Sequence, residues 1–237
     1  MDRSSNPAIT PAFGDSRKLV TMDRTCLERR FLLIKPAAAA TPALFLDRDG
    51  VIIEDRHHIS DPAAVELCPG ARQLIHHASQ AGWPVVVITN QSGIARGLLS
   101  WQQYEGVTDR MLELLGPEAP IAAIYVNGHG PEAPPQSWRK PSPAMLFDAA
   151  GALHLDLARS VLIGDRLSDL RAGAAAGVAM VCHVLSGHGE RERPAVRRWR
   201  EELAPSGLHA DVPELLMLPS LMSFPLQRLA CLTADRV

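Results

Sequence analysis

The sequence is poor in the features that mark proteins built around nucleic acids or membranes. Aromatic residues make up 5% of its 237 residues, and 24 basic against 26 acidic side chains leave a formal net charge of −2. Few rings and no basic excess disfavour the base stacking and phosphate contacts of nucleic-acid binding. No stretch approaches the roughly 20 consecutive apolar residues of a membrane-spanning helix. We therefore expect neither a nucleic-acid partner nor a membrane partner.

Cysteine is also scarce. The four cysteines, Cys26, Cys68, Cys182 and Cys231, lie far apart and form no Cys-x-x-Cys pair. This spacing argues against a cysteine-rich zinc site and against a disulfide framework. The N-terminal residues lack the apolar segment of a secretory signal. We expect a cytoplasmic protein with reduced thiols.

Residues 1–42 have little hydrophobic periodicity, and Pro, Ser, Ala and Arg dominate them. We predict a flexible N-terminal extension over residues 1–42, one folded domain over 43–222, and a C-terminal tail over 223–237. Apolar residues make up 46% of the chain, which is enough for a substantial core. Global disorder is therefore excluded.

Apolar runs alternate with helical patterns from residue 43 onward. Ala71, Leu74, Ile75 and Ala78 have the spacing of a helix with one buried face, and residues 85–88 form a β-branched run typical of a buried strand. This alternation predicts an α/β fold, a parallel sheet with helices on both faces. The expected strands are 84–88, 121–126, 160–164, 179–184 and the edge strand 210–212. The expected helices are 101–115, 142–153 with Ser142 as its N-cap, 167–176, 190–202 and 214–222.

Polar residues follow the apolar strands at four places: Asp47 with Asp49, Thr89 with Asn90, Lys140, and Asp165. The carboxyl ends of parallel strands meet at one edge of a sheet, where ligands of such folds bind. These side chains are therefore expected to lie together.

Clustered carboxylates repel one another unless a cation lies among them, and oxygen ligands beside phosphate favour Mg²⁺. A carboxylate is also a competent nucleophile for phosphoryl transfer. Thr89 offers a hydroxyl group and Lys140 a positive charge to the phosphoryl oxygens. The residues alone thus indicate a Mg²⁺-dependent enzyme that acts on phosphate groups.

The segment Asp47-Arg48-Asp49-Gly50-Val51 resembles motif I of the haloacid dehalogenase (HAD) superfamily, and Thr89, Lys140 and Asp165 stand where its other motifs are expected. Within it, residues 89–97 (TNQSGIARG), 139–141 and 164–169 resemble the D-glycero-D-manno-heptose 1,7-bisphosphate phosphatase family. The resemblance covers residues 43–185 and extends to about 221. It implies a three-layer Rossmann-like HAD fold without a large cap domain.

The resemblance also implies roles. Asp47 would be the nucleophile, and Asp49 would protonate the leaving oxygen, activate water and bind Mg²⁺ through its carbonyl. Asp165 would complete the protein's Mg²⁺ ligands, so the metal set is Asp47, Asp49 and Asp165. The residues expected to bind the phosphate or orient the sugar phosphate are Thr89, Asn90, Gln91, Arg96, Arg139 and Lys140. Asp169 is left open between the metal's surroundings and a helix N-terminus.

The chain departs from the family at two places. Many members hold zinc in a loop before the Arg-Lys-Pro segment, but the matching positions here are Asn127, His129, Gln136 and Trp138. One histidine cannot form a tetrahedral zinc site, so we predict no structural zinc. Nearer motif I the family has Asn and Gly-Tyr where this chain has Ile53 and His57-His58, which puts the identity of the sugar in question.

The expected function is hydrolysis of a sugar bisphosphate in heptose synthesis for lipopolysaccharide, by a monomer that acts on a small molecule. Histidinol-phosphate phosphatase is a close alternative, although residues 95–97 (Ala-Arg-Gly) favour the heptose substrate. A polynucleotide 3′-phosphatase would need a basic channel, which the net charge disfavours. A binding protein that has lost catalysis is a further alternative, although all the expected catalytic residues are present.

Overall fold

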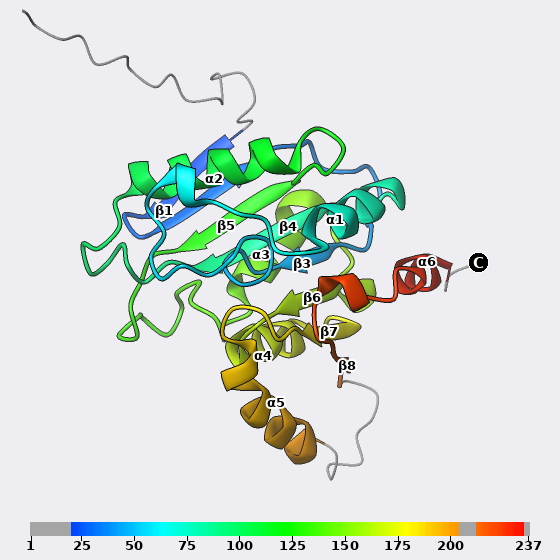
Figure 1. Cartoon of the computed structure of the whole chain (residues 1–237). Helices are drawn as coiled ribbons and strands as arrows, with labels where there is room; N and C mark the ends of the chain where they lie inside the picture. The colour runs from blue at the N-terminus through cyan, green and yellow to red at the C-terminus, as the bar shows by residue number, and fades with distance from the viewer. Residues whose placement is uncertain (1–19, 204–211, 235–237) are drawn as a thin grey trace, which may run out of the picture.

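An eight-stranded sheet runs through the molecule in the order β1-β2-β5-β4-β3-β6-β7-β8 (Figure 1). The structure is a computed structural model and describes residues 20–203 and 212–234. Six neighbouring strands, from β5 to β8, are parallel, whereas β1 and β2 form an antiparallel hairpin that pairs with β5. The strands are β1 (Val20–Thr25), β2 (Glu28–Leu32), β3 (Leu44–Leu46), β4 (Val85–Asn90), β5 (Ala123–Asn127), β6 (Val161–Gly164), β7 (Met180–His183) and β8 (Glu214–Met217).

Helices cover both faces of this sheet, because successive strand residues point to opposite sides. On β3, Leu44 and Leu46 pack in the core beneath α1, α2 and α6, whereas Phe45 packs in the core beneath α3, α4 and α5. The helices are α1 (Ala71–Gln80), α2 (Trp101–Leu115), α3 (Ala144–Leu153), α4 (Leu167–Ala176), α5 (Gly189–Leu203) and α6 (Gln227–Ala234). The predicted three-layer α/β fold is confirmed, and no separate cap domain interrupts residues 20–203 or 212–234.

The central strands and helices agree with the sequence predictions to within two residues at most ends. α2 and α4 have the predicted bounds, and the capping box of Ser100 and Gln103 explains where α2 begins. α3 is an exception, because it begins at Ala144 rather than at Ser142. The Ser142 hydroxyl still accepts the N–H of Ala144, at 3.3 Å.

The prediction of a flexible extension through residue 42 is wrong for residues 20–32. These residues form β1 and β2, and β2 pairs with β5 from Glu28 opposite Asn127 to Leu32 opposite Ala123. Short strands whose residues are mixed in polarity have a weak periodic signal, and the sheet edge supplies the partner that stabilises them. The rest of the predicted extension, residues 1–19, lies outside the described residues.

Two predictions at the C-terminal end are also wrong. Residues 214–217 form β8, the edge strand, instead of a helix, because Leu215 and Met217 pack on one face of the sheet while Leu216 and Leu218 pack on the other. Of the predicted strand 210–212, residues 210 and 211 lie outside the described residues. The predicted tail contains α6, whose Leu229 is fully buried.

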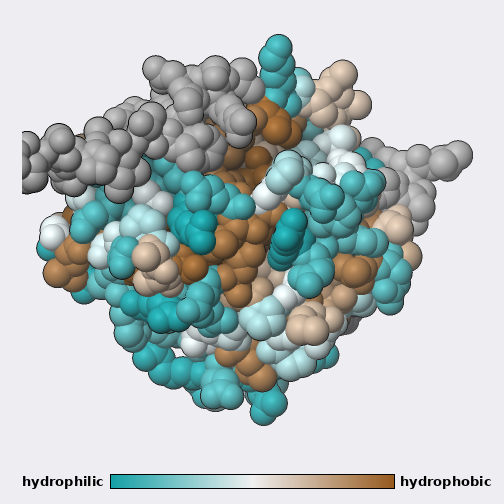
Figure 2. Space-filling view, turned by 45° about the horizontal axis from the view of Figure 1, so that its top comes forward, coloured by the Kyte–Doolittle hydropathy of each residue, from teal (hydrophilic) through white to brown (hydrophobic). Residues whose placement is uncertain are grey.

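The molecular surface mixes polar and apolar residues. Figure 2, in which the top of Figure 1 comes forward, shows apolar residues gathered in the middle of this face with polar residues around them. Among residues 20–203 and 212–234, no helix is long and apolar enough to cross a membrane.

Candidate active site

Three central strands bring the predicted site residues to one edge of the sheet. Leu46 of β3 lies opposite Val87 of β4 and Ile163 of β6, so the ends of these strands are side by side. Asp47, Thr89 and Asp165 therefore emerge next to one another, as the strand-end argument predicted.

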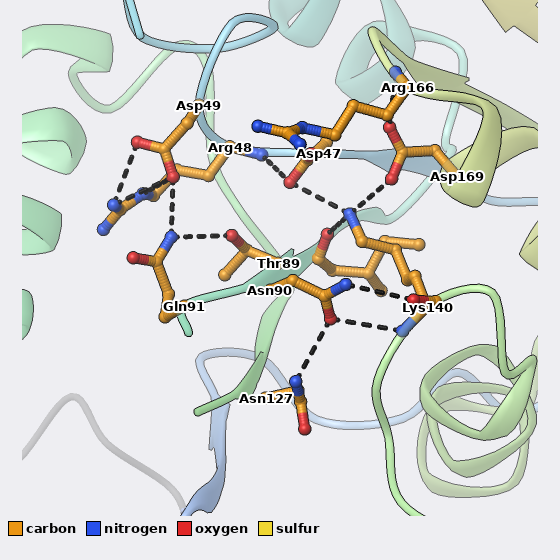
Figure 3. A network of polar contacts seen from close by, with 11 residues as sticks. Asp47, Arg48, Asp49, Thr89, Asn90, Gln91, Asn127, Lys140, Arg166 and Asp169 are labelled. Carbon is orange, nitrogen blue, oxygen red and sulfur yellow. Dashed lines mark hydrogen bonds and ion pairs between the residues drawn. The ribbon is translucent and has the colours of Figure 1, made fainter. Parts of the chain in front are cut away.

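Lys140 lies at the centre of this group (Figure 3). Its Nζ is 3.0 Å from Asp47 Oδ1 and 2.8 Å from Asp169 Oδ1, and it donates a hydrogen bond to the Ile88 carbonyl at 2.9 Å. The ammonium group is fully buried. Burial alone would lower the pKa of Lys140, but Asp169 and Asp47 outweigh this effect and raise it. Lys140 is thus a fixed positive charge at the strand ends.

Asp47, Asp165 and Asp169 form a buried acidic cluster whose ligand atoms lie within 4.8 Å of one another. Burial raises the pKa of Asp47 to about 6, an effect opposed by Lys140 and reinforced by Asp169 and Asp49. Burial and the charges of Asp169 and Asp47 raise the pKa of Asp165 to about 8. Negative charge is therefore in excess here, even with Lys140 present.

This cluster fits a divalent cation. Asp165 Oδ2 accepts the backbone N–H of His188 at 2.7 Å, whereas its Oδ1 is buried without a hydrogen-bond partner. Buried polar atoms without partners are rare, and three carboxylates with a free oxygen are suited to Mg²⁺. Gly50 keeps this space open, because at its φ of +79° an added Cβ would lie 2.7 Å from Asp165 Oδ2.

Asp49 lies apart from the acidic cluster. Its carboxylate accepts hydrogen bonds from Arg48 Nη2 at 3.0 Å and from Gln91 Nε2 at 2.6 Å. Gln91 Nε2 also donates to Thr89 Oγ1 at 2.9 Å, and the buried Arg48 guanidinium stacks 4.7 Å from the Tyr104 ring. The Asp49 side chain is therefore held in one orientation by its neighbours rather than directed toward the cluster.

Asn90 links the loops that carry the site. Its Oδ1 accepts the N–H of Lys140 at 3.2 Å and the Nδ2 of Asn127 at 3.3 Å, and its Nδ2 donates to the Lys140 carbonyl at 3.2 Å. The side chain thus binds both backbone groups of Lys140 (Figure 3). From the sequence, Asn90 is predicted to bind the phosphate, whereas in this arrangement its amide positions Lys140.

A cavity of about 440 Å³ opens above these residues, a volume typical of small-molecule sites. Arg139 and Arg166 line it, and Arg139 Nη1 donates to the His129 carbonyl at 3.0 Å. Burial, Arg166 and Arg96 lower the pKa of Arg139, so the three guanidinium groups repel one another. Arg96 itself is exposed and does not line the cavity, although its Nη2 is 2.6 Å from His58 Nε2.

The mouth of the cavity holds a histidine cluster that the sequence did not reveal. His188 Nε2 is 2.8 Å from Asp55 Oδ2, and its ring centroid is 5.9 Å from that of His57. Arg191 Nη2 lies 2.8 Å from His188 Nδ1, and since a guanidinium can only donate, Nε2 carries the proton that faces Asp55. Asp55, His188 and Arg191 thus form a hydrogen-bond network in which both ring nitrogens of a neutral His188 are engaged.

Sequence reasoning missed other residues for identifiable reasons. From the sequence, Asp169, in the first turn of α4, is left open between two roles, and Arg48, which stands inside motif I, is assigned no role. His188 lies in the loop after β7, where no periodicity or motif marks it. Its placement depends on the tertiary fold alone.

Comparison with known proteins adds a family context. The family model described as HAD-hydrolase-like matches residues 137–214. A Mesorhizobium japonicum protein named D-glycero-beta-D-manno-heptose-1,7-bisphosphate 7-phosphatase is 48% identical over 145 residues, which cover 58% of this chain and 67% of that protein. A Salmonella typhi protein of the same name is 37% identical over 157 residues, covering 63% and 84%.

A solved structure is similar as well. The crystal structure of D,D-heptose 1,7-bisphosphate phosphatase from B. bronchiseptica, complexed with magnesium and phosphate, superimposes with a TM-score of 0.62 at 33% sequence identity. The match covers 76% of this chain and 94% of that one. Similarity thus extends from sequence to the arrangement of the sheet and its helices.

Proposed function

The chain belongs to the HAD-like heptose bisphosphate phosphatases, and from this membership we propose that it removes the 7-phosphate of D-glycero-beta-D-manno-heptose 1,7-bisphosphate with Mg²⁺. The substrate is supported by the names of the relatives and by the cavity, which has the size for a phosphorylated sugar. Arg139 and Arg166 line the same cavity and can neutralise a second phosphate group away from the reacting one.

We assign the nucleophile to Asp47. Its Oδ1 accepts the N–H of Arg48 at 2.7 Å and lies 3.0 Å from Lys140 Nζ, which leaves Oδ2 to attack phosphorus. The attack forms an acyl phosphate on Asp47 and releases the oxygen of the sugar. During this transfer Lys140 stabilises the negative charge on the phosphoryl group.

Asp49 is the general acid and the general base. In its protonated form it gives a proton to the leaving sugar oxygen, and as a carboxylate it takes one from the water that hydrolyses the acyl phosphate. Arg48 and Gln91 orient it for both steps. Thr89 keeps Gln91 in place through the contact between Gln91 Nε2 and Thr89 Oγ1.

Asp47 and Asp165, with the Asp49 carbonyl that the family resemblance implies, would hold Mg²⁺, while Asp169 stays paired with Lys140. When bound, Mg²⁺ supplies positive charge to the phosphoryl oxygens. The donor set suits it because all the side-chain ligands are carboxylate oxygens. The buried Asp165 Oδ1 without a hydrogen-bond partner is the observation that supports this assignment most directly.

One observation carries the proposed function: a buried lysine bridges the nucleophile Asp47 and the helical Asp169 at the strand ends of a HAD-like sheet. The test is phosphate release with Mg²⁺ from both anomers of heptose 1,7-bisphosphate, histidinol phosphate, fructose 1,6-bisphosphate and a 3′-phosphorylated oligonucleotide. We expect the β anomer to be hydrolysed with the highest kcat/KM and to yield the 1-phosphate. A higher kcat/KM for histidinol phosphate would overturn the substrate assignment.

The role of Asp47 is tested by Asp47→Asn. We expect no detectable acyl phosphate and at least about a 10³-fold loss of kcat, because the amide cannot act as the nucleophile. Asp156→Asn is the matched control, since Asp156 pairs with Arg159 in the turn before β6, at the opposite edge of the sheet. Full activity of Asp47→Asn would refute the assignment of the nucleophile.

A further inference from the structure

The β1–β2 hairpin reaches the loop that carries Arg139 and leads to Lys140. This loop, residues 128–139, joins the end of β5 to Lys140 and contains three prolines and two glycines. The carbonyl of Leu27, in the turn of the hairpin, accepts the N–H of Gly128 at 2.6 Å. An added Cβ at Gly128 would lie 3.0 Å from the same carbonyl, so the two segments are in close contact.

Glu28, the first residue of β2, contacts both ends of this loop. Its Oε1 accepts the backbone N–H of Trp138 at 2.7 Å and lies 3.6 Å from His129 Nε2. The side chain is 3% exposed, and a buried carboxylate is retained only where partners compensate for its lost hydration. Loop residues nine positions apart therefore meet at one carboxylate.

Both ends of the loop lead directly to Arg139. Trp138 precedes it in sequence, and its ring is buried 5.2 Å from that of Tyr125. The carbonyl of His129 accepts the hydrogen bond from Arg139 Nη1. Lys140 has further contacts with Asn90, Asp47 and Asp169, so it depends on Glu28 much less than Arg139 does.

We propose that Glu28 is a positioning residue, which fastens both ends of the 128–139 loop through Trp138 and His129 and so orients Arg139 in the cavity. The loop has no strand or helix of its own, and a contact that joins its ends restricts its conformations. The hairpin is itself attached to α2, because Arg29 pairs with Glu105 at 3.0 Å and Trp101 Nε1 donates to the Cys26 carbonyl at 3.0 Å. Glu28 thus acts from a fixed support.

The test that does not depend on catalysis is hydrogen exchange of the full chain. Glu28→Ala should accelerate exchange at the Trp138 amide and at the other amides of the loop by at least about tenfold, with α4 unchanged. Glu28→Gln should restore much of the protection, because its side-chain oxygen can still accept from Trp138. Glu105→Ala is the matched control, because it also removes one carboxylate, in this case the partner of Arg29 between the hairpin and α2. It should leave the Trp138 amide protected.

The kinetic test rests on the proposed function. If Arg139 binds the distal phosphate, Glu28→Ala should raise KM for heptose 1,7-bisphosphate about tenfold while kcat stays within about twofold, and Glu28→Gln should recover most of this loss. If the chain does not hydrolyse this substrate, the kinetic test cannot be made, but the hydrogen-exchange test of Glu28 is unaffected. Glu28→Asp, whose carboxylate is one methylene shorter, replaces the alanine variant if that variant does not fold. Unchanged exchange at Trp138 in Glu28→Ala or Glu28→Asp would overturn the proposal, as would equal acceleration in Glu105→Ala.

Discussion

The strand-end residues and the residues at the cavity mouth are held in different ways. Asp47, Asp169 and Lys140 are buried and joined by contacts of 2.8–3.0 Å at the ends of the central strands. At the mouth, His57 and His58 are exposed and belong to loops, as does the neighbouring Arg96, which contacts His58. Asp47, Asp169 and Lys140 thus form a rigid frame for the chemical step. The residues that would select the sugar lie on loops, which tolerate substitution.

This difference predicts at which positions a substitution leaves stability and activity unchanged. Breaking a buried ion pair leaves an uncompensated charge in a low-dielectric interior, but an exposed group recovers its hydration from solvent. His57 and His58 also have φ angles of 46° and 53°, in the left-handed region, where histidine is more frequent than most other non-glycine residues. The largest effects should therefore come from the strand ends and the smallest from the mouth.

Lys140→Met should produce the largest effect. Removing the charge leaves Asp47 and Asp169 buried without their cation, which should cost about 3–5 kcal/mol in the free energy of unfolding. The loss of one charge that faces the phosphoryl group should lower kcat by about 10²–10³. Urea unfolding in Mg²⁺-free buffer and phosphate release at saturating substrate measure the two quantities.

The exposed Lys35 supplies the control for this variant, because Lys35→Met removes the same charge at a residue outside the buried cluster of Asp47, Asp165 and Asp169. Lys35→Met should change neither the free energy of unfolding nor kcat measurably. A Lys140→Met enzyme with kcat within tenfold of the parent would show that the strand-end charge is not used in phosphoryl transfer.

Arg139→Lys should have an intermediate effect and would sharpen the comparison, because Arg139 lies between the rigid frame and the mouth. Lysine keeps the charge but lacks the planar group that can donate to both the His129 carbonyl and a phosphate. We expect KM for the bisphosphate to rise about 10-fold with kcat little changed. The measurement is KM for the bisphosphate and for a monophosphate, taken from initial rates. Arg110→Lys on α2 is the control. An equal rise of KM for both substrates would contradict a role in binding the second phosphate.

The sequence alone was sufficient to predict the strand-end residues Asp47 and Asp165, but not the charges that lie beside them. Strand-end reasoning located Asp47 and Asp165, because buried parallel strands and the polar residues directly after them leave a local signal, whereas Lys140 is separated from the end of β5 by the 128–139 loop. Lys140 is paired with Asp169 only through the fold, and Asp169 had an equally good local explanation at a helix N-terminus. Local patterns identify strand ends, but they do not state which charges meet there.

The hairpin and the C-terminal edge were missed for a related reason. β1 and β2 depend on pairing with β5, and β8 depends on pairing with β7, so their stability comes from partners distant in sequence. Glu28 illustrates this point, since nothing near it in the sequence predicts its contact with Trp138 across 110 residues. Residues of this kind can be found only once the sheet order is known.

His58→Ala should have the smallest effect and so tests the other side of the comparison. His58 lines the cavity and contacts Arg96, yet both side chains are exposed and Arg96 keeps its contacts with Ser92. We expect KM to rise by no more than about threefold, and the free energy of unfolding to stay within about 0.5 kcal/mol, as is usual for exposed positions. Steady-state kinetics and urea unfolding, with His77→Ala on α1 as control, measure both. A loss of kcat comparable to that of Lys140→Met would mean that the mouth takes part in the chemical step, and the division between rigid frame and tolerant mouth would be wrong.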